Sequence, residues 1–178
     1  HWLHAMTKGR PFVTLKMGTS IDGRVAAAQG VETSISGEAS RHRVHELRSR
    51  VDGILVGTGT AVVDDPELTP RLVDTQHRPH RFVMGERALP PHLALLRDHS
   101  ATQLVTHDPA AALALLQEHQ IRHLLIEGGP RIARAFVEHE LVDELVWITA
   151  PVVLGEGPLA LGDTALERRS EEHTSELQ

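Results

Sequence analysis

LLIEGGPRIARA, from Leu124 to Ala135, is the stretch of sequence that decides the fold. An apolar strand at His123 to Ile126 runs into two glycines, and Pro130 suits the first position of the helix that follows. Glycines let backbone N–H groups approach an anion, and a helix N-terminus adds partial positive charge, so the turn is shaped for phosphate. On the Gly-Gly-Pro pattern alone, an ordinary strand-to-helix turn is the more frequent interpretation.

Glu127 lies between this strand and the glycines. A carboxylate at the end of a buried strand stands where ligands bind in α/β sheets, which favours a functional role. The alternative is a carboxylate that only accepts hydrogen bonds from nearby backbone N–H groups.

Strands and helices alternate around this turn. The clearest helix is DPAAALALLQEHQ, with Asp108 at its cap, Pro109 at its first position, and Leu113 and Leu116 facing inward. The alternation predicts an α/β fold with a mostly parallel central sheet and flanking helices. The other expected elements are strands at residues 12–17, 53–56, 81–84, 102–105 and 144–153, a helix at 37–50 capped by Ser36, and a helix at 130–139.

Composition limits the function classes. The chain has 178 residues, enough for one domain with a core, and 40% of them are hydrophobic. No apolar run approaches the roughly 18 residues of a membrane span. A net charge of −6 argues against a nucleic-acid partner, and the absence of cysteine excludes disulfides and thiolate chemistry. A bacterial cytoplasm fits this composition.

Both ends of the chain look unusual. His1 stands where a start methionine is expected, so we expect the sequence to begin inside a longer protein. Residues 169–178, RSEEHTSELQ, have no apolar periodicity and resemble a translated sequencing adapter, so we expect them to lie outside the native domain.

Two further segments carry candidate binding residues. In LKMGTSIDGR, Lys16 can project from a strand toward a cleft and Gly18 lets a ligand pack on the backbone, while Asp22-Gly23 is more economically interpreted as a turn. In GTGTAVVDDPELTPR, glycines, hydroxyls, two aspartates and Arg71 crowd a loop with about one helical turn after a buried strand. Asp64-Asp65-Pro66 can equally be a helix stop.

The thirteen histidines do not form a metal motif, because HExxH, HxH and cysteine partners are lacking. We therefore expect no metal site. A serine hydrolase is unsupported because there is no GxSxG motif.

Four segments occur together in one order: GRPFVTLKMGTSIDGR, HELRSR, VGTGTAVVDDPELTPR and LLIEGGPRIARAFVEHELVDELVWITAPVVLG. Their combination resembles the reductase domain of bifunctional riboflavin-biosynthesis proteins, whose fold is similar to dihydrofolate reductase. The resemblance covers residues 9–155, and we expect the domain to span residues 9–168 with the family's final strands missing. Residues 1–8 resemble a linker from an upstream deaminase domain, whose own zinc signature is absent from this chain.

The resemblance implies reduction of 5-amino-6-(5-phosphoribosylamino)uracil to its ribitylamino form with NADPH. The ribosylamine opens to an imine that accepts hydride, so positioning supplies most of the catalysis. A cytoplasmic homodimer is also implied. The alternatives are a related dihydrofolate-reductase-like enzyme acting on another pyrimidine or a pterin, and an inactive nucleotide-binding fragment.

The resemblance also assigns residues. Catalytic roles fall on Lys16, Asp64 and Glu127. Contacts to NADPH fall on Gly18, Ser34, Thr60, Asp64, Gly129, Pro130, Arg131, Ile132, Ala133, Arg134 and Ala135. Contacts to the substrate fall on Glu32, Arg48, Leu68, Arg71 and Glu127, with the two arginines suited to its phosphate.

The chain departs from the family pattern at two places. Ser34 stands where a Trp is common, which removes an aromatic wall of the cofactor pocket. Gly85 and Glu86 replace a common Asp-Ser pair, and a glutamate there disfavours a 2′-phosphate unless it points away.

Overall fold

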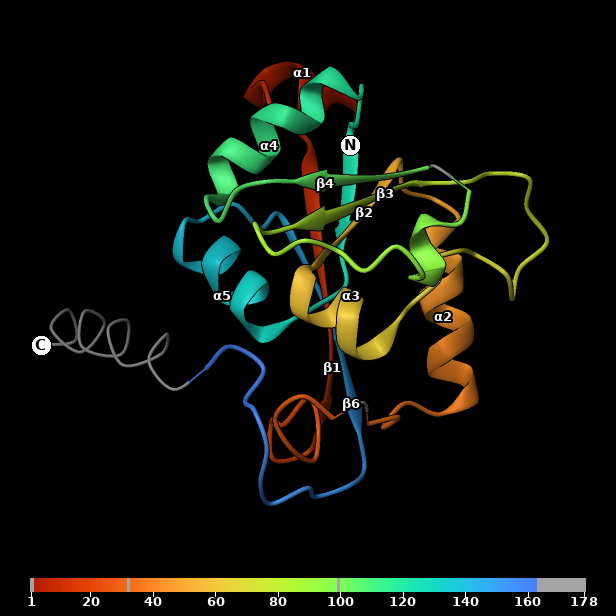
Figure 1. Ribbon diagram of the computed structural model, residues 1–178, viewed down its shortest axis with the longest axis vertical. Coiled ribbons are helices and arrows are strands. Elements are labelled where there is room, and N and C mark those ends of the chain that lie inside the picture. The colour runs from red at the N-terminus through yellow and green to blue at the C-terminus, as the bar shows by residue number, and fades with distance from the viewer. Residues whose placement is uncertain (1, 32, 99, 163–178) are drawn as a thin grey trace, which may run out of the picture.

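The centre of the computed structural model is a six-stranded sheet (Figure 1). The structure describes residues 2–31, 33–98 and 100–162. All pairings between its strands are parallel, so the predicted α/β fold with a parallel sheet is confirmed. The strands lie in the order β4-β3-β2-β5-β1-β6 and comprise β1 (Phe12–Ser20), β2 (Gly53–Gly57), β3 (His80–Met84), β4 (Ala101–Leu104), β5 (His123–Ile126) and β6 (Glu144–Ala150).

Helices cover both faces of the sheet, which separates two cores (Figure 1). Phe136 and Leu116 pack with Phe82 on one face, while Val51 and Leu68 pack with Ile54 on the other. The first face carries α4 (Pro109–Glu118) and α5 (Pro130–Glu138), and the second carries α2 (Glu38–Arg48), α3 (Thr58–Asp64) and a short 3-10 helix (Ala94–Leu96). A further helix, α1 (Trp2–Lys8), precedes β1.

Helix α4 begins as its sequence predicts. The Asp108 carboxylate accepts a hydrogen bond from the Ala110 N–H at 2.9 Å, and Pro109 occupies the first turn. Leu113 and Leu116 are buried, which confirms the predicted inward face.

The expected Ser36 cap of α2 is wrong. The N-cap is Gly37, in extended conformation and without a side-chain hydrogen bond. Ser36 instead turns toward Gly18, and its carbonyl accepts a hydrogen bond from the Arg41 guanidinium at 2.7 Å. The side chain is therefore directed toward β1 rather than toward the first turn of α2.

Strand β1 is longer than the alternation of its residues predicts. It continues past Met17 to Ser20 because residues 18–20 pair with residues 148–150 of β6. The turn expected at Asp22-Gly23 is confirmed, since the Gly23 N–H donates to the Ser20 carbonyl at 3.0 Å. Strand β6 ends at Ala150, three residues before its predicted end.

The Asp22 carboxylate joins this turn to the segment after β6. It accepts hydrogen bonds from the Leu154 N–H at 3.1 Å and the Gly155 N–H at 2.8 Å. A hydrogen bond with Ser20 and these backbone donors lower the pKa of Asp22 to about 2.

Strand β6 lies at the edge of the sheet, where Leu145 and Trp147 are exposed. Within residues 2–31, 33–98 and 100–162, no strand pairs with its outer side. An open edge of this kind is a template for pairing with other chains. The predicted boundary at residue 168 and the adapter-like tail at residues 169–178 lie outside the described residues.

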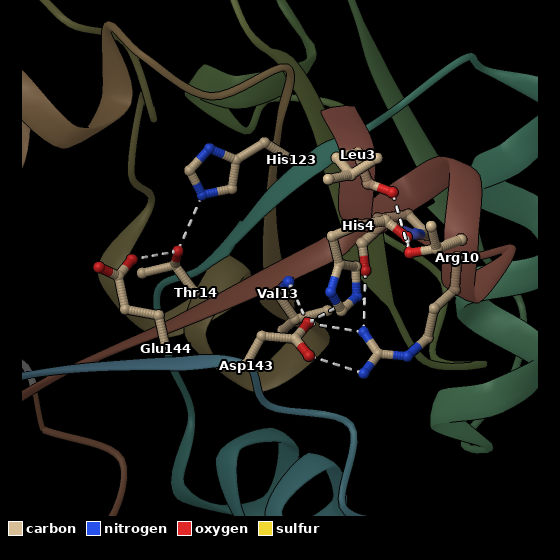
Figure 2. A network of polar contacts seen from close by, with 10 residues as sticks. Leu3, His4, Arg10, Val13, Thr14, His123, Asp143 and Glu144 are labelled. Atoms are coloured by element: carbon tan, nitrogen blue, oxygen red, sulfur yellow. Dashed lines mark hydrogen bonds and ion pairs between the residues drawn. The ribbon is translucent and has the colours of Figure 1, made fainter. Parts of the chain in front are cut away.

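A polar network fixes the amino ends of β1 and β6 (Figure 2). The Arg10 guanidinium donates two hydrogen bonds to the Asp143 carboxylate, at 2.6 Å and 2.8 Å, and the Val13 N–H donates a third at 2.8 Å. His4 of α1 lies 3.5 Å from the same carboxylate. Burial alone would raise the pKa of Asp143, but these donors outweigh it and hold the pKa below its ordinary value.

We predict that Asp143→Asn lowers the free energy of unfolding by about 2 kcal/mol at pH 7, because a half-buried Arg10 and a backbone N–H lose a charged acceptor. The native pKa of Asp143 is lowered, so its contribution is complete above the carboxyl's ordinary value of 3.8 and disappears as pH falls through the native value. Urea unfolding should therefore show a constant difference from pH 7 to about pH 5 and a smaller one below about pH 4. Glu46→Gln, which breaks an exposed pair with Arg43, is the control and should change the free energy of unfolding much less than Asp143→Asn does.

Candidate active site

Neighbouring strands β2 and β5 open a cleft at their carboxyl ends. The helices that follow them leave toward opposite faces of the sheet, because Ala61 of α3 packs in one core and Ala133 of α5 in the other. Such a divergence is the place where open α/β sheets bind ligands. The cleft has a volume of about 790 Å³, within the range of roughly 300–1,000 Å³ of small-molecule sites.

The glycine turn after β5 forms one wall of this cleft. Gly129 has φ +71°, and a Cβ there would lie 3.1 Å from the Thr60 hydroxyl. A Cβ on Gly57 would meet the Ile132 side chain at 2.9 Å. The backbone of the turn therefore approaches α3 more closely than a larger residue allows, and it leaves the N-terminus of α5 open to the cleft.

Glu127 forms a buried ion pair with Arg48 of α2. The Nε of Arg48 lies 2.5 Å from one carboxylate oxygen and its Nη2 lies 2.9 Å from the other. The side chain of Glu127 is 5% exposed and that of Arg48 is 11% exposed. Burial would raise the pKa of Glu127, but the charge and hydrogen bonds of Arg48 lower it below its ordinary value, with smaller help from Lys16. Glu127 is therefore ionised at neutral pH.

The pKa of Arg48 is shifted in the direction opposite to that of Glu127. Burial would lower the pKa of Arg48, but the Glu127 carboxylate outweighs this effect and raises it. Next to the pair, burial lowers the pKa of His45, and the charges of Arg48 and Arg71 lower it further. His45 accepts a hydrogen bond from the Leu72 N–H at 3.4 Å, in agreement with a neutral imidazole.

Most of the predicted cofactor and catalytic residues meet at this cleft. Those that line it are Lys16, Gly18, Ser34, Thr60, Asp64, Glu127, Gly129, Pro130, Arg131 and Ile132. Ala133 is fully buried behind this wall, and Arg134 forms an ion pair with Glu138 at 2.7 Å on α5. Arg134 and Ala135 are not among the lining residues.

The predicted substrate residues are more scattered. Leu68 is 2% exposed in the second core and has φ +53°. Arg71 is exposed and pairs with Glu67 at 3.0 Å, while Arg48 lies behind Glu127 rather than on the cleft surface. Glu32 lies outside the described residues.

Two basic side chains that the sequence motifs did not single out, Arg87 and His107, line the cleft beyond β3 and β4. Each follows the carboxyl end of a predicted strand, and that position is the signal that could have identified them. Lys16, Arg87 and Arg131 carry positive charge on this lining. They outnumber the Asp64 carboxylate there, while the Glu127 charge is compensated by Arg48.

Across the described parts of the chain, no group of three or more potential metal-ligating side chains occurs. No helix among these residues is both long enough and apolar enough to cross a bilayer.

Comparison with known proteins identifies the family. The model of the RibD C-terminal domain matches residues 11–177. The chain belongs to this family. The RibD C-terminal domain in this chain is 43% identical over 166 residues to the riboflavin biosynthesis protein RibD of Mycobacterium tuberculosis, covering 91% of this chain and 48% of that protein. It therefore spans about half the length of this curated relative.

Two other relatives extend the comparison. A 2,5-diamino-6-ribosylamino-4(3H)-pyrimidinone 5′-phosphate reductase of Methanothermobacter thermautotrophicus is 33% identical over 174 residues, covering 82% of this chain and 80% of that protein. The solved structure of Acinetobacter baumannii RibD superposes with a TM-score of 0.85 at 28% identity, covering 95% of this chain and 54% of that one. The RibD C-terminal domain fold expected from the sequence is confirmed.

We predict that the Arg48–Glu127 pair is strongly coupled. Glu127→Gln should lower the free energy of unfolding by about 3–5 kcal/mol, because it leaves the Arg48 charge buried without a partner. Adding Arg48→Met should restore part of this loss. Urea unfolding of the parent chain, the two single variants and the double variant gives the coupling energy.

The pair also makes stability depend on pH. Because the native pKa of Glu127 is lowered, the pair contributes its full stabilisation above the carboxyl's ordinary value of 4.5 and loses it as pH falls through the native pKa.

The exposed Arg134–Glu138 pair is the control, and its coupling should stay below about 0.5 kcal/mol. A coupling equally small at Arg48–Glu127 would contradict the interpretation of these two side chains as one buried charged unit.

Proposed function

We propose that this domain reduces 5-amino-6-(5-phosphoribosylamino)uracil to 5-amino-6-(5-phosphoribitylamino)uracil with NADPH, in riboflavin biosynthesis. The observation that carries the proposal is the cleft between β2 and β5, where the glycine turn and an ionised, arginine-bound carboxylate lie side by side. Membership in the RibD C-terminal domain family, together with a relative named as a reductase, supports a reduction as the reaction. A homodimer in the cytoplasm remains our expectation for its state in the cell.

The glycine turn supports a dinucleotide. A pyrophosphate needs backbone N–H groups at close range, and the two glycines before α5, both at positive φ, leave the backbone of the turn without side chains that would cover it. Arg131 in the first turn of α5 adds a charge beside it. The remaining predicted contacts, Gly18, Ser34 and Asp64, line the same cleft and would hold the rest of the cofactor.

The substrate half of the site is proposed around Glu127 and Lys16. Glu127 stays ionised and keeps acceptor capacity on both oxygens, so it can orient donors on the pyrimidine or ribose. Arg71 pairs with an exposed Glu67, and this pair has a small net stability, so that a substrate phosphate can replace it. Arg48 would act on the substrate through Glu127, to which it is bound, whereas the roles of Leu68 and Glu32 rest on the family resemblance.

NADPH, when bound, supplies the hydride that reduces the imine carbon of the opened ribosylamine. Lys16 lies on β1 close enough to Glu127 to lower the pKa of that carboxyl. Its ammonium group can therefore be held beside the reacting atoms, where it stabilises developing negative charge and delivers the proton that the product nitrogen needs. Asp64 also lines the cleft, and we assign it a catalytic role together with Lys16 and Glu127.

The substrate is tested by incubating the purified chain with NADPH and each candidate, while the absorbance of reduced nicotinamide is recorded. We expect the phosphoribosylaminouracil to be reduced fastest. Faster reduction of the 2,5-diaminopyrimidinone would assign the activity named for the archaeal relative, and faster reduction of a pterin would assign a dihydrofolate-reductase-like activity. Cofactor binding without any oxidation would identify an inactive nucleotide-binding fragment.

We also predict that Lys16→Met lowers kcat by about 10²–10⁴-fold, the usual contribution of a positioned general acid, while the Kd for NADPH changes less than about threefold. Steady-state kinetics and calorimetry measure the two quantities. Lys8→Met, at the exposed end of α1, removes the same charge away from the cleft and should leave kcat unchanged. Full activity of the Lys16 variant would exclude this group from the reaction.

A further inference from the structure

His45 is a buried titratable side chain to which the proposed reaction assigns no role. It is 5% exposed and lies on α2 three residues before Arg48, so the two side chains share one face of the helix. The charges of the Arg48–Glu127 pair act on its pKa, and so does the charge of Arg71. His45 is therefore within electrostatic range of both parts of the proposed substrate site.

The segment that carries Arg71 depends on contacts from outside it, because the chain between α3 and β3 forms no helix or strand. Helix α2 holds this segment on both sides of Arg71. On one side, the Thr69 carbonyl accepts a hydrogen bond from Nη1 of Arg48 at 3.3 Å. On the other, the Leu72 N–H donates to Nδ1 of His45 at 3.4 Å. Two side chains of one helix thus fix the backbone that flanks Arg71.

Only a neutral imidazole can make the second of these contacts, because Nδ1 must keep its lone pair to accept a backbone N–H. Burial lowers the pKa of His45, and the positive charges of Arg48 and Arg71 lower it further. The Glu127 carboxylate acts in the opposite direction, with a smaller effect. The imidazole is therefore neutral at pH 7, and it adds no third positive charge beside two arginines.

The side-chain contact of Arg71 does little to fix its direction. The Arg71 side chain is 56% exposed, and its partner Glu67 is 48% exposed and lies in the same segment. An exposed pair of this kind has a small net stability. The place of the Arg71 guanidinium relative to Glu127 is therefore set mainly by the backbone that α2 holds.

We propose that His45 is a positioning residue, which holds the backbone beside Arg71 so that its guanidinium meets the substrate phosphate, and which thereby sets the preference for a phosphorylated substrate. This inference rests on the proposed function, which assigns the phosphate to Arg71. In this arrangement His45 contacts no substrate atom and acts through Arg71.

Steady-state kinetics at neutral pH compare 5-amino-6-(5-phosphoribosylamino)uracil with its dephosphorylated form, 5-amino-6-(ribosylamino)uracil, each with NADPH. His45→Leu should raise KM for the phosphorylated substrate about three- to tenfold, the usual effect of one lost hydrogen bond, and leave kcat within about twofold. For the dephosphorylated substrate, kcat/KM should stay within about twofold. A merely structural role would weaken both substrates alike.

Two further variants separate the hydrogen bond from the loss of a side chain. His45→Asn keeps an acceptor close to the place of Nδ1, so it should return KM for the phosphorylated substrate to within about twofold of the parent value. His42→Leu removes an imidazole that is 55% exposed on the same helix, and it is the matched control. It should change KM for neither substrate.

Because His45 is proposed to act through Arg71, the effects of the two substitutions should not add. Arg71→Gln should reduce the preference for the phosphorylated substrate more than His45→Leu does. Adding His45→Leu to Arg71→Gln should reduce it less than about 1.5-fold further. Full additivity would overturn the positioning role, and so would equal losses for both substrates, no loss for either, or failure of His45→Asn to restore KM.

Calorimetric titration with ribose 5-phosphate and with ribose separates this inference from the proposed function. Suppose that the parent chain reduces no pyrimidine but binds ribose 5-phosphate. If His45→Leu then weakens this binding at least about threefold and leaves ribose unaffected, the inference stands and the proposed reaction fails. If pyrimidine is reduced and the phosphate preference does not change in His45→Leu, the reaction stands and the inference fails. Neither reduction nor binding of ribose 5-phosphate by the parent chain would overturn both.

Discussion

The insertion of β5 between β2 and β1 is the constraint on which the cleft depends. It places the two glycine-rich turns, after β2 and after β5, on adjacent strands although they are about seventy residues apart in sequence. Because α3 and α5 then pack on opposite faces, the turns diverge and the space between them stays open. Glu127 can lie beside the cleft only because its strand ends at this point.

The charge of the cleft follows from the same placement. A carboxylate buried to this degree would ordinarily be protonated or displaced, but Arg48 reaches it from α2 with a two-pronged hydrogen bond. The pair is therefore nearly neutral as a unit, and the uncompensated charges on the cleft surface belong mainly to cations. An anionic ligand thus meets a favourable field, while the acceptor oxygens of Glu127 remain available for orientation.

Local sequence signals predicted the elements whose causes are local. Asp108 and Pro109 start α4 through contacts within one turn, so the sequence located this helix correctly. The end of β1 depends on pairing with β6, more than a hundred residues away, and its alternation alone could not show that Gly18 belongs to the strand. For the same reason, the motifs identified Arg48 and Glu127 separately, but only the fold shows that each is the partner of the other.

Contacts that stabilise the sheet lie at the amino ends of its strands, whereas the residues that line the cleft lie at the carboxyl ends. At the amino ends, Asp143 gathers Arg10, His4 and the Val13 backbone, and Thr14 links His123 to Glu144 at 2.8 Å and 2.7 Å (Figure 2). These contacts fix β1 against both neighbours. Residues at the carboxyl ends can therefore include glycines with positive φ and charged side chains that line the cleft, because the register of the strands that carry them is set at the opposite end.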